Sequence, residues 1–201
     1  MNGFELRRNE KKKAIMKAAL ELFDQYGFDK VTVTEIAEKA HVSKVSIYKY
    51  FESKGNLRRM IIKDILEESI TKIKTLNETK TDFIEKIEEY IQIRTWYFGK
   101  YGLDFIFEAV ESDPILRKQF NDFNASNKQL VMVFIDKGKR SGVFSPDVSD
   151  DAIEIYIDMV QTYLMHNKEI RDRIEHNPEL VRELNMLFMD GIIRGTDPLK
   201  T

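Results

Sequence analysis

Apolar residues recur along most of this 201-residue chain with the period of an α-helix. Near the N-terminus, the spacing i, i+3, i+4, i+7 and i+8 is occupied by Ile15, Ala18, Ala19, Leu22 and Phe23, which places them on one face of a helix. Strand-like alternation is rare, and glycine (9 residues) and proline (4 residues) are sparse. The pattern predicts an all-α protein of about nine helices.

Capping residues mark the first two helices. Asn9 is a candidate N-cap for the first helix, and Gly27 is a candidate stop. Thr32 and Glu35 have the T-x-x-E spacing of a capping box, which opens a short second helix that ends near Ala40.

A third helix is expected over residues 44–50, capped by Ser43, and a fourth after Ser53. The tight turn around His41 and Val42 gives the second and third helices the spacing of a helix-turn-helix unit. Apolar residues of both helices turn inward, which leaves the third helix an outer face of Lys44, Val45, Ser46 and Lys49. A short exposed helix of this composition suits the major groove of DNA, where Lys contacts phosphate or guanine and a Val methyl packs on thymine.

The rest of the chain is expected to form longer helices, over residues 80–100, 103–111, 115–123, 125–139, 150–167 and 178–193. Charge shifts inside the fourth helix. Residues 1–63 hold 14 Lys and Arg against 8 Asp and Glu, a net charge of +6, whereas residues 64–201 hold 18 against 26, a net charge of −8. A basic end on an acidic body favours contact with a polyanion, although a solvated charged face would give the same count.

Several kinds of site are absent from the sequence. Without cysteine there are no disulfides, thiolate metal sites or cysteine nucleophiles. No apolar run approaches the roughly 20 residues of a membrane span, and no apolar signal segment follows the basic N-terminus, so we expect a protein of the cytoplasm. His41, His166 and His176 lack metal-ligand spacing, and there is no P-loop, dinucleotide fingerprint or nucleophile elbow. We therefore expect no metal, no cofactor and no enzymatic activity.

Four sequence blocks stand in order within the first 60 residues. They are A-A-L-E-L-F-D-Q-Y-G-F (18–28), T-V-T-E-I-A-E-K-A (32–40), V-S-K-V-S-I-Y-K-Y-F (42–51) and S-K-G-N-L (53–57). Together they resemble the DNA-binding domain of the TetR family of bacterial transcriptional regulators. The chain departs from the family at His41, where Gly is usual in the turn, at Tyr50 and at Gly55. The resemblance implies a three-helix DNA-binding domain with a helix-turn-helix in residues 1–52 and a helical effector-binding and dimerisation domain in 53–201.

The resemblance also implies DNA contacts. The expected contact residues lie on the two short helices and at the start of the fourth: Thr32, Thr34, Ser43, Lys44, Val45, Ser46, Tyr48, Lys49 and Lys54. Lys44, Val45 and Ser46 would face bases, and the others would touch phosphates. The alternatives are structural, with Thr32 and Ser43 acting only as caps, the Tyr48 ring packed in the core, and the lysines solvated.

One helix-turn-helix unit buries too little surface for tight specific binding, so we expect two units about one DNA turn apart in a homodimer. The resemblance places the dimer contact on two apolar stripes of the last long helices: Ile153, Tyr156, Ile157, Val160 and Leu164, then Leu180, Leu184, Leu187 and Phe188. Packing within a single chain is the alternative for these side chains.

The middle of the chain is rich in aromatic residues, and the resemblance places a pocket for a small effector there. The candidate ligand-binding residues are Trp96, Tyr101, Phe105, Glu108, Phe123, Met159 and Tyr163. An apolar pocket suits a small apolar effector, and the interleaved carboxylates of Asp104, Glu108 and Glu111 favour a cationic amphipathic one. The alternative is that most of these rings are core.

Together these features predict a ligand-responsive regulator, most simply a repressor. It would bind a near-palindromic operator in double-stranded DNA as a homodimer and be released by its effector. Two rivals belong to other classes. One is a helical ligand-binding or enzymatic body with a vestigial N-terminal motif, and the other is a protein that coats DNA without sequence preference.

Overall fold

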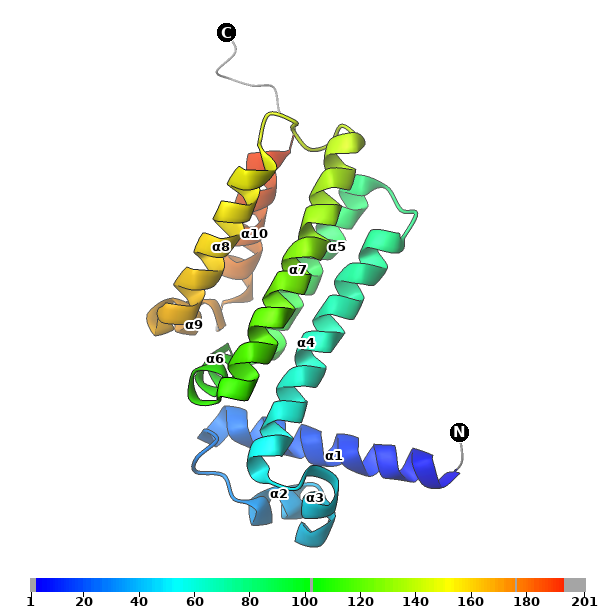
Figure 1. Cartoon of the computed structure of the whole chain (residues 1–201), viewed down its shortest axis with the longest axis vertical. Coiled ribbons are helices and arrows are strands. Elements are labelled where there is room, and N and C mark those ends of the chain that lie inside the picture. Colours follow the sequence, from blue (N-terminus) through cyan, green and yellow to red (C-terminus); the bar gives the residue numbers. More distant parts are fainter. Residues whose placement is uncertain (1–2, 102, 176, 194–201) are drawn as a thin grey trace.

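The computed structural model describes residues 3–101, 103–175 and 177–193, which are largely helical (Figure 1). Ten helices lie within these ranges: α1 Gly3–Tyr26, α2 Val33–Lys39, α3 Lys44–Phe51, α4 Lys54–Glu78, α5 Phe83–Lys100, α6 Leu103–Ser112, α7 Pro114–Arg140, α8 Asp150–His166, α9 Lys168–Glu175 and α10 Pro178–Ile192. The described ranges contain no strand, only one isolated bridge between Phe144 and Ile193. The expected all-α class is confirmed.

The helices form two parts along the long axis of the molecule. Helices α1, α2 and α3 lie together at one end, and α4 runs from them into the body (Figure 1). In the body α4 packs against α5 and α7, and α10 packs against α5. Helix α8 lies beside α10 at the side of the body away from α4 (Figure 1). Helix α4 is thus shared by both parts.

An apolar core joins the two parts. Phe23 of α1 stacks on Phe105 of α6, with ring centroids 5.9 Å apart, and both side chains are buried. Leu57 and Ile61 of α4 belong to the same buried cluster. A shift of α4 or α6 therefore has to be accommodated by the N-terminal helices, because packed cores deform little.

Two expected boundaries are wrong. Helix α1 begins at Gly3, so Asn9 lies inside the helix and does not cap it. The segments 115–123 and 125–139 form the single helix α7. Neither Asn9 nor Asn124 breaks a helix, since asparagine is only moderately unfavourable in a helix interior.

Helix α9 was not expected at all. Its short sequence buries Arg171 and Ile174 against the body. The Arg171 Nε donates to Asp104 Oδ1 of α6 at 2.7 Å, and its Nη1 donates to the carbonyls of Leu164 and Met165 at the end of α8. These partners fix α9 in place, and none of them is evident from sequence periodicity.

Candidate nucleic-acid interface and ligand cleft

Helix α2 is opened by the expected capping box. The Thr32 Oγ1 accepts from the Glu35 N–H at 3.2 Å, and the Thr32 N–H donates to Glu35 Oε2 at 2.7 Å. Hydrogen bonds from the backbone N–H and the hydroxyl of Thr32 lower the pKa of Glu35. Thr32 therefore has a structural role, and both Thr32 and Thr34 are also exposed at the surface.

The turn between α2 and α3 contains a residue in the left-handed backbone region, although His41 stands there in place of the usual glycine. His41 has φ 53°, in the left-handed region that histidine tolerates better than most side chains. Val42 N–H then donates to the carbonyl of Ala37 at 2.9 Å, which closes the turn. Residues 44–51 consequently start a new helix directly after the turn.

Helix α3 turns one face into the core and the other to solvent. Ile47 and Phe51 are buried. On the opposite face the side chains of Val45 and Tyr48 are 74% and 51% exposed, and Lys44 and Lys49 are exposed too. An aliphatic side chain this exposed has no packing role within the chain.

Ser43 and Ser46 interact with each other at the start of α3. The Ser43 Oγ accepts from the Ser46 N–H at 3.2 Å, and the two hydroxyls lie 2.9 Å apart. Ser46 is half-buried, so it is less open to solvent than its neighbour Val45. The expected cap is thus present, and the hydroxyl of Ser43 is exposed beside it.

Lys54 is placed differently from the other expected contacts. Its Nζ donates to the carbonyls of Phe28 and Val31 at 2.8 Å each and lies 3.5 Å from that of Asp29. The same ammonium lies 4.3 Å from the centroid of the Phe28 ring. Since an ammonium has three donors, a phosphate contact would compete with these bonds.

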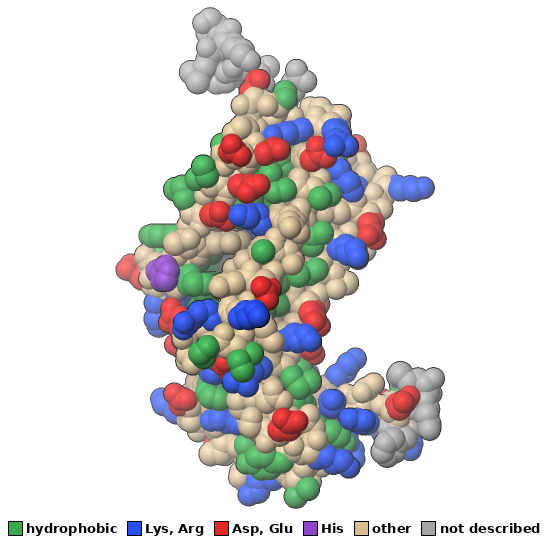
Figure 2. Space-filling model, viewed as in Figure 1, with side chains coloured by type: hydrophobic (Ala, Val, Ile, Leu, Met, Phe, Trp, Pro, Cys, Tyr) green, Lys and Arg blue, Asp and Glu red, His purple; other side chains and the backbone are tan. Residues whose placement is uncertain are grey.

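Basic side chains are frequent in the part of the molecule that contains α3. Figure 2 shows blue Lys and Arg side chains gathered along the lower part of the molecule, where α1, α2, α3 and the start of α4 lie, whereas red and blue mix over the body. This distribution matches the net charge of +6 that residues 1–63 carry. Clustered positive charge on one part of a surface is the electrostatic footprint of nucleic-acid binding.

Two arginines of α4 connect the start of this helix to the corner between α6 and α7 in the body. Arg59 Nε donates to Asp113 Oδ2 at 2.7 Å, and Arg58 donates from Nη2 to Ser112 Oγ at 3.3 Å. The Arg58 guanidinium also lies 3.8 Å from the centroid of the Phe28 ring. Sequence reasoning missed these residues, because the pairs span 54 positions and no motif marks them.

Asp113 is also the N-cap of α7, and the hydrogen bonds of the cap favour its ionised form. Its Oδ1 accepts from the Ile115 and Leu116 N–H groups and so caps α7. Burial alone would raise the pKa of Asp113, but the hydrogen bonds from Arg59, Ile115 and Leu116 outweigh it and lower that pKa. The carboxylate is therefore ionised at neutral pH.

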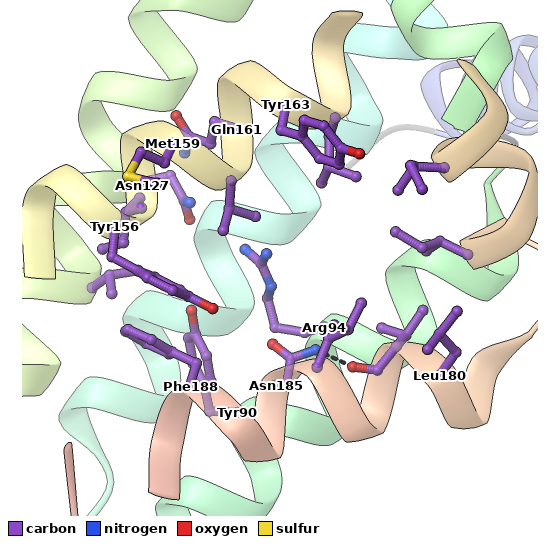
Figure 3. Close-up of a pocket in the computed structure, with 18 of the residues that line it drawn as sticks. Tyr90, Arg94, Asn127, Tyr156, Met159, Gln161, Tyr163, Leu180, Asn185 and Phe188 are labelled. Atoms are coloured by element: carbon purple, nitrogen blue, oxygen red, sulfur yellow. Dashed lines mark hydrogen bonds between the residues drawn. The ribbon is translucent and has the colours of Figure 1, made fainter. Parts of the chain in front are cut away.

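A cleft of about 510 Å³ opens between α8 and α10 (Figure 3). Its walls are mostly apolar or aromatic, including Tyr90, Tyr156, Tyr163 and Phe188. Figure 3 shows the Arg94 side chain of α5 extending into the space between the two helices. A largely apolar cavity of this size with a few polar groups is typical of a small-molecule site.

A second, smaller cavity of about 150 Å³ lies next to the cleft. Five residues line both cavities: Arg94, Asn127, Val160, Gln161 and Leu164. On its far side the smaller cavity is bounded by Ile65, Leu66 and Ser69 of α4. The two cavities together thus reach from α8 and α10 to α4.

The expected ligand-binding residues divide between these places. Tyr101 and Phe123 line the smaller cavity, and Met159 and Tyr163 line the cleft. Trp96, Phe105 and Glu108 line neither. Phe105 is stacked on Phe23, Glu108 is exposed, and the Trp96 ring lies under the ammonium groups of Lys72 and Lys100.

The carboxylates that suggested a cationic effector are also outside both cavities. Asp104 pairs with Arg171 and Lys168, and Glu111 is exposed like Glu108. Of the α6 carboxylates, Asp104 therefore holds α9 in place and the other two are exposed to solvent. They give no support for a cationic ligand.

The expected dimer stripes are only partly free. Ile153 and Leu164 are 2% and 9% exposed, so they belong to the core of the chain itself. Large apolar side chains nevertheless remain exposed on the same two helices: Ile155, Tyr156, Met159, Val160, Tyr163, Leu184 and Leu187. The remaining expected residues, Ile157, Leu180 and Phe188, are half-buried and line the cleft.

Other kinds of site find little support in the described ranges. None of the helices there combines the length and hydropathy that crossing a membrane requires. Across residues 3–101, 103–175 and 177–193, no cluster of three or more His, Cys, Asp or Glu side chains is arranged to hold a metal ion. His176 lies outside the described residues.

Comparison with known proteins agrees with this geometry. Residues 15–60 match the family described as bacterial regulatory proteins, tetR family. The HTH-type transcriptional regulator RutR of Escherichia coli (strain K12) is 40% identical over 86 residues, which cover 42% of this chain and 39% of RutR. The match thus spans about two fifths of that relative's length.

In other proteins the likeness extends over about nine tenths of the chain. The uncharacterized HTH-type transcriptional regulator YvkB of Bacillus subtilis (strain 168) is 25% identical over 190 residues, covering 90% of this chain and 96% of YvkB. A solved putative transcriptional regulator from Saccharomonospora viridis, in complex with choline, has a TM-score of 0.69 at 17% identity and covers 93% of this chain and all of its own. The fold of the body is therefore shared as well as that of the N-terminal helices.

Proposed function

The chain belongs to the TetR family of bacterial transcriptional regulators, whose members are not enzymes, and on this premise we propose that it is a ligand-released repressor that binds a near-palindromic operator as a homodimer. The observation that carries the proposal is the outer face of α3. There Lys44, Val45, Tyr48 and Lys49 are exposed together on a helix whose other side is locked in the core.

The chemistry of this face fits the major groove. Ammonium groups of Lys44 and Lys49 pair with phosphates or guanine, and the bare Val45 methyl groups can pack on the methyl of thymine. The tyrosine hydroxyl and the free N–H groups at the start of α3 add donors for phosphate. The surrounding net charge of +6 steers this end of the molecule toward DNA.

A homodimer is supported by the exposed apolar side chains of α8 and α10. Seven large ones remain exposed on these two helices, from Ile155 to Leu187, and some of them also line the cleft. Extensive exposed apolar surface marks an interaction site. A twofold contact through the same patch on each chain would bury them and present two α3 helices to one duplex. We retain residues 1–52 and 53–201 as the two domains, divided where Glu52 adopts a positive φ between α3 and α4.

Release by an effector is supported by the position of the cavities. The smaller cavity touches Ile65, Leu66 and Ser69 of α4, and α4 is joined through Arg58 and Arg59 to the α6–α7 corner. A ligand that favours one position of α4 shifts the separation of the two α3 helices, and only about 1.4 kcal/mol of coupling gives a tenfold loss of affinity. The choline complex of the regulator from Saccharomonospora viridis supports a small-molecule effector in this fold. Such a regulator acts in the cytoplasm, where it meets the chromosome.

Selection of DNA from a random library tests the proposal. The expected result is enrichment of one near-palindromic sequence whose half-sites lie about one or two helical turns apart, bound by two chains. A protein that coats DNA would retain DNA without enriching any sequence, and a vestigial motif would retain none. Either result would overturn the proposed function.

A further inference from the structure

We propose that the smaller cavity beside α4 holds a neutral polar group of the effector, a hydroxyl or a carboxamide, through the Tyr97 hydroxyl and the side-chain oxygen of Asn127. The apolar part of the same molecule lies among the aromatic rings of α6 and α7. This inference rests on the proposed function, because it names the chemical class of the effector.

Two buried polar atoms at this cavity lack hydrogen-bond partners. They are the hydroxyl of Tyr97 on α5 and Oδ1 of Asn127 on α7, and neither has a partner among the residues that the structure describes. Both residues line the smaller cavity. Because buried polar atoms of folded proteins are nearly always paired, a cavity with two unpaired ones suits a ligand that supplies the missing hydrogen bonds.

Asn127 belongs to both cavities. The residue is only 5% exposed, yet it lines the cleft as well as the smaller cavity. Figure 3 shows its side chain among those that surround the cleft. Asn127 can therefore contact a ligand in either cavity.

The two unpaired atoms favour a group that both donates and accepts. Oδ1 of Asn127 can only accept. Burial, and then the negative charge of Glu68, raises the pKa of Tyr97, so its hydroxyl stays protonated at neutral pH and can donate. A carboxylate lacks the donor and an ammonium lacks the acceptor, whereas a hydroxyl or a carboxamide has both. Arg94 also lines the cavity, but it already takes part in an interaction within the chain, so a ligand charge is not needed to pair it.

The rest of the lining suits an apolar body. The ring centroids of Phe107 and Phe120 lie 5.7 Å apart, and those of Phe120 and Phe123 lie 6.0 Å apart. All three rings line the smaller cavity, where they offer an aromatic wall.

The cavity also reaches the helix that leads to the DNA-binding part. Ile65, Leu66 and Ser69 of α4 line it, and α4 runs from the body to α1, α2 and α3 (Figure 1). A molecule that fills the cavity therefore contacts the helix whose position sets the separation of the two α3 helices in the proposed dimer.

Four probes with one common body test the polar group: 4-propylphenol, 4-propylanisole, propylbenzene and 4-propylbenzoate. At neutral pH the first donates and accepts, the second only accepts, the third does neither, and the fourth is an anion. Isothermal titration calorimetry measures their affinities for the full chain. We expect 4-propylphenol to bind at least about tenfold more tightly than the others, because each of them leaves Oδ1 of Asn127 unpaired. Equal affinities of 4-propylphenol and 4-propylanisole, tighter binding of 4-propylbenzoate, or no binding of 4-propylphenol would overturn the inference.

Substitutions identify the residues responsible. Tyr97→Phe and Asn127→Leu should each lower the preference for 4-propylphenol over propylbenzene, and the double variant should remove it. Tyr101→Phe and Asn185→Leu are the matched controls and should keep the preference. Tyr101 lines the same cavity but donates its hydroxyl to Glu68, and Asn185 lines the cleft, not the smaller cavity, and donates to a carbonyl of its own helix. A preference that survives in the double variant would overturn the assignment.

Unfolding without any probe separates an unpaired hydroxyl from a bonded one. Tyr97→Phe removes a hydroxyl that has no partner, so the free energy of unfolding should not fall. Tyr101→Phe removes the donor to Glu68 and should lower it. A loss of stability in Tyr97→Phe as large as that in Tyr101→Phe would show that the Tyr97 hydroxyl is already bonded within the protein, and it would overturn the inference.

Operator affinity without any probe is measured on the same preparations. If 4-propylphenol is not preferred but operator binding is intact, the inference about the polar group fails and the proposed function stands. If operator binding is absent but 4-propylphenol is preferred, the proposed function fails instead.

Discussion

Arg59 of α4 and Asp113 at the start of α7 lie 2.7 Å apart, from guanidinium Nε to carboxylate Oδ2. The pair joins the helix that leaves the DNA-binding part to the corner between α6 and α7. The Asp113 side chain is almost fully buried, while the Arg59 side chain is about one-third exposed. The Arg59–Asp113 pair is therefore a polar contact that reports the position of α4 relative to the body.

Asp113→Asn should lower the free energy of unfolding by about 1 kcal/mol at pH 7, since the partly exposed Arg59 moderates the charge effect. Asparagine retains the cap of α7, so the change removes mainly the ion pair. Asp136→Asn breaks an exposed i,i+4 pair with Arg140 and should change stability by a few tenths of a kcal/mol at most. Urea unfolding measures both.

The Asp113 effect should depend on pH in a defined direction. Because the pKa of Asp113 is lowered in the folded state, its stabilisation is complete above the ordinary aspartate pKa of about 3.9 and is lost as the pH falls through the lowered pKa. The difference between wild type and Asp113→Asn should therefore shrink in acid. A difference that stays constant from pH 7 into the acid transition would contradict the assignment.

Two substitutions of Ser43 separate its cap from a phosphate contact. Ser43→Ala should cost about 1 kcal/mol of stability, because the Ser46 N–H loses the side-chain acceptor of the cap and keeps only the Ser43 carbonyl. Ser43→Asp should keep the cap yet weaken operator binding at least tenfold, since it places a carboxylate beside DNA phosphate. Ser149→Asp, at the cap of α8, should leave operator affinity unchanged. Operator binding by Ser43→Asp as tight as wild type would place Ser43 away from the duplex.

Lys54→Met should destabilise the fold without changing how operator affinity depends on salt concentration. Two short hydrogen bonds from its ammonium to carbonyls are lost, at a cost of about 2 kcal/mol, while the aliphatic stem is preserved. The salt dependence of operator affinity should keep its slope. Lys49→Met is the matched comparison, with nearly unchanged stability and a slope reduced by about 0.9 for each phosphate contact removed. A reduced slope in Lys54→Met would restore Lys54 to the DNA contacts.

Leu187→Glu should produce a monomer, because it places a charge on the most exposed apolar position of α10, 68% exposed in one chain. Ile115→Glu adds the same charge at an exposed isoleucine of α7, outside the α8–α10 surface, and should leave the oligomeric state unchanged. Light scattering after size-exclusion chromatography gives the mass of each variant. An unchanged mass for Leu187→Glu, or a monomer for both, would move the dimer contact away from α10.

Local signals in the sequence were sufficient for the DNA-binding part. Its capping box, its turn and the inward face of α3 depend on residues at most five positions apart, and the structure has each of them. Asn9 misled because a residue that suits a cap is also tolerated inside a helix, and nothing between Gly3 and Asn9 ends the helix.

The body depends on contacts that the sequence order hides. Asp104 stands in an acidic, aromatic segment and suggested a cationic ligand, yet its partner Arg171 lies 67 positions away. Ile153 and Leu164 share the period of a helix stripe with Tyr156 and Val160, and only packing determines which of them turn inward. The cleft could not be predicted for the same reason, since five helices contribute to its lining.

The most direct measurement is the affinity of the selected operator for the variant Lys44→Ala/Lys49→Ala, titrated over salt concentration with folding verified. The account predicts that specific binding is lost and that the remaining dependence on salt is less steep, by about 0.9 for each phosphate contact removed. The control Lys74→Ala/Lys118→Ala removes two exposed lysines of the body and should bind as the wild type does. If Lys44→Ala/Lys49→Ala binds the operator with wild-type affinity and slope, α3 does not enter the groove and the proposed function is wrong.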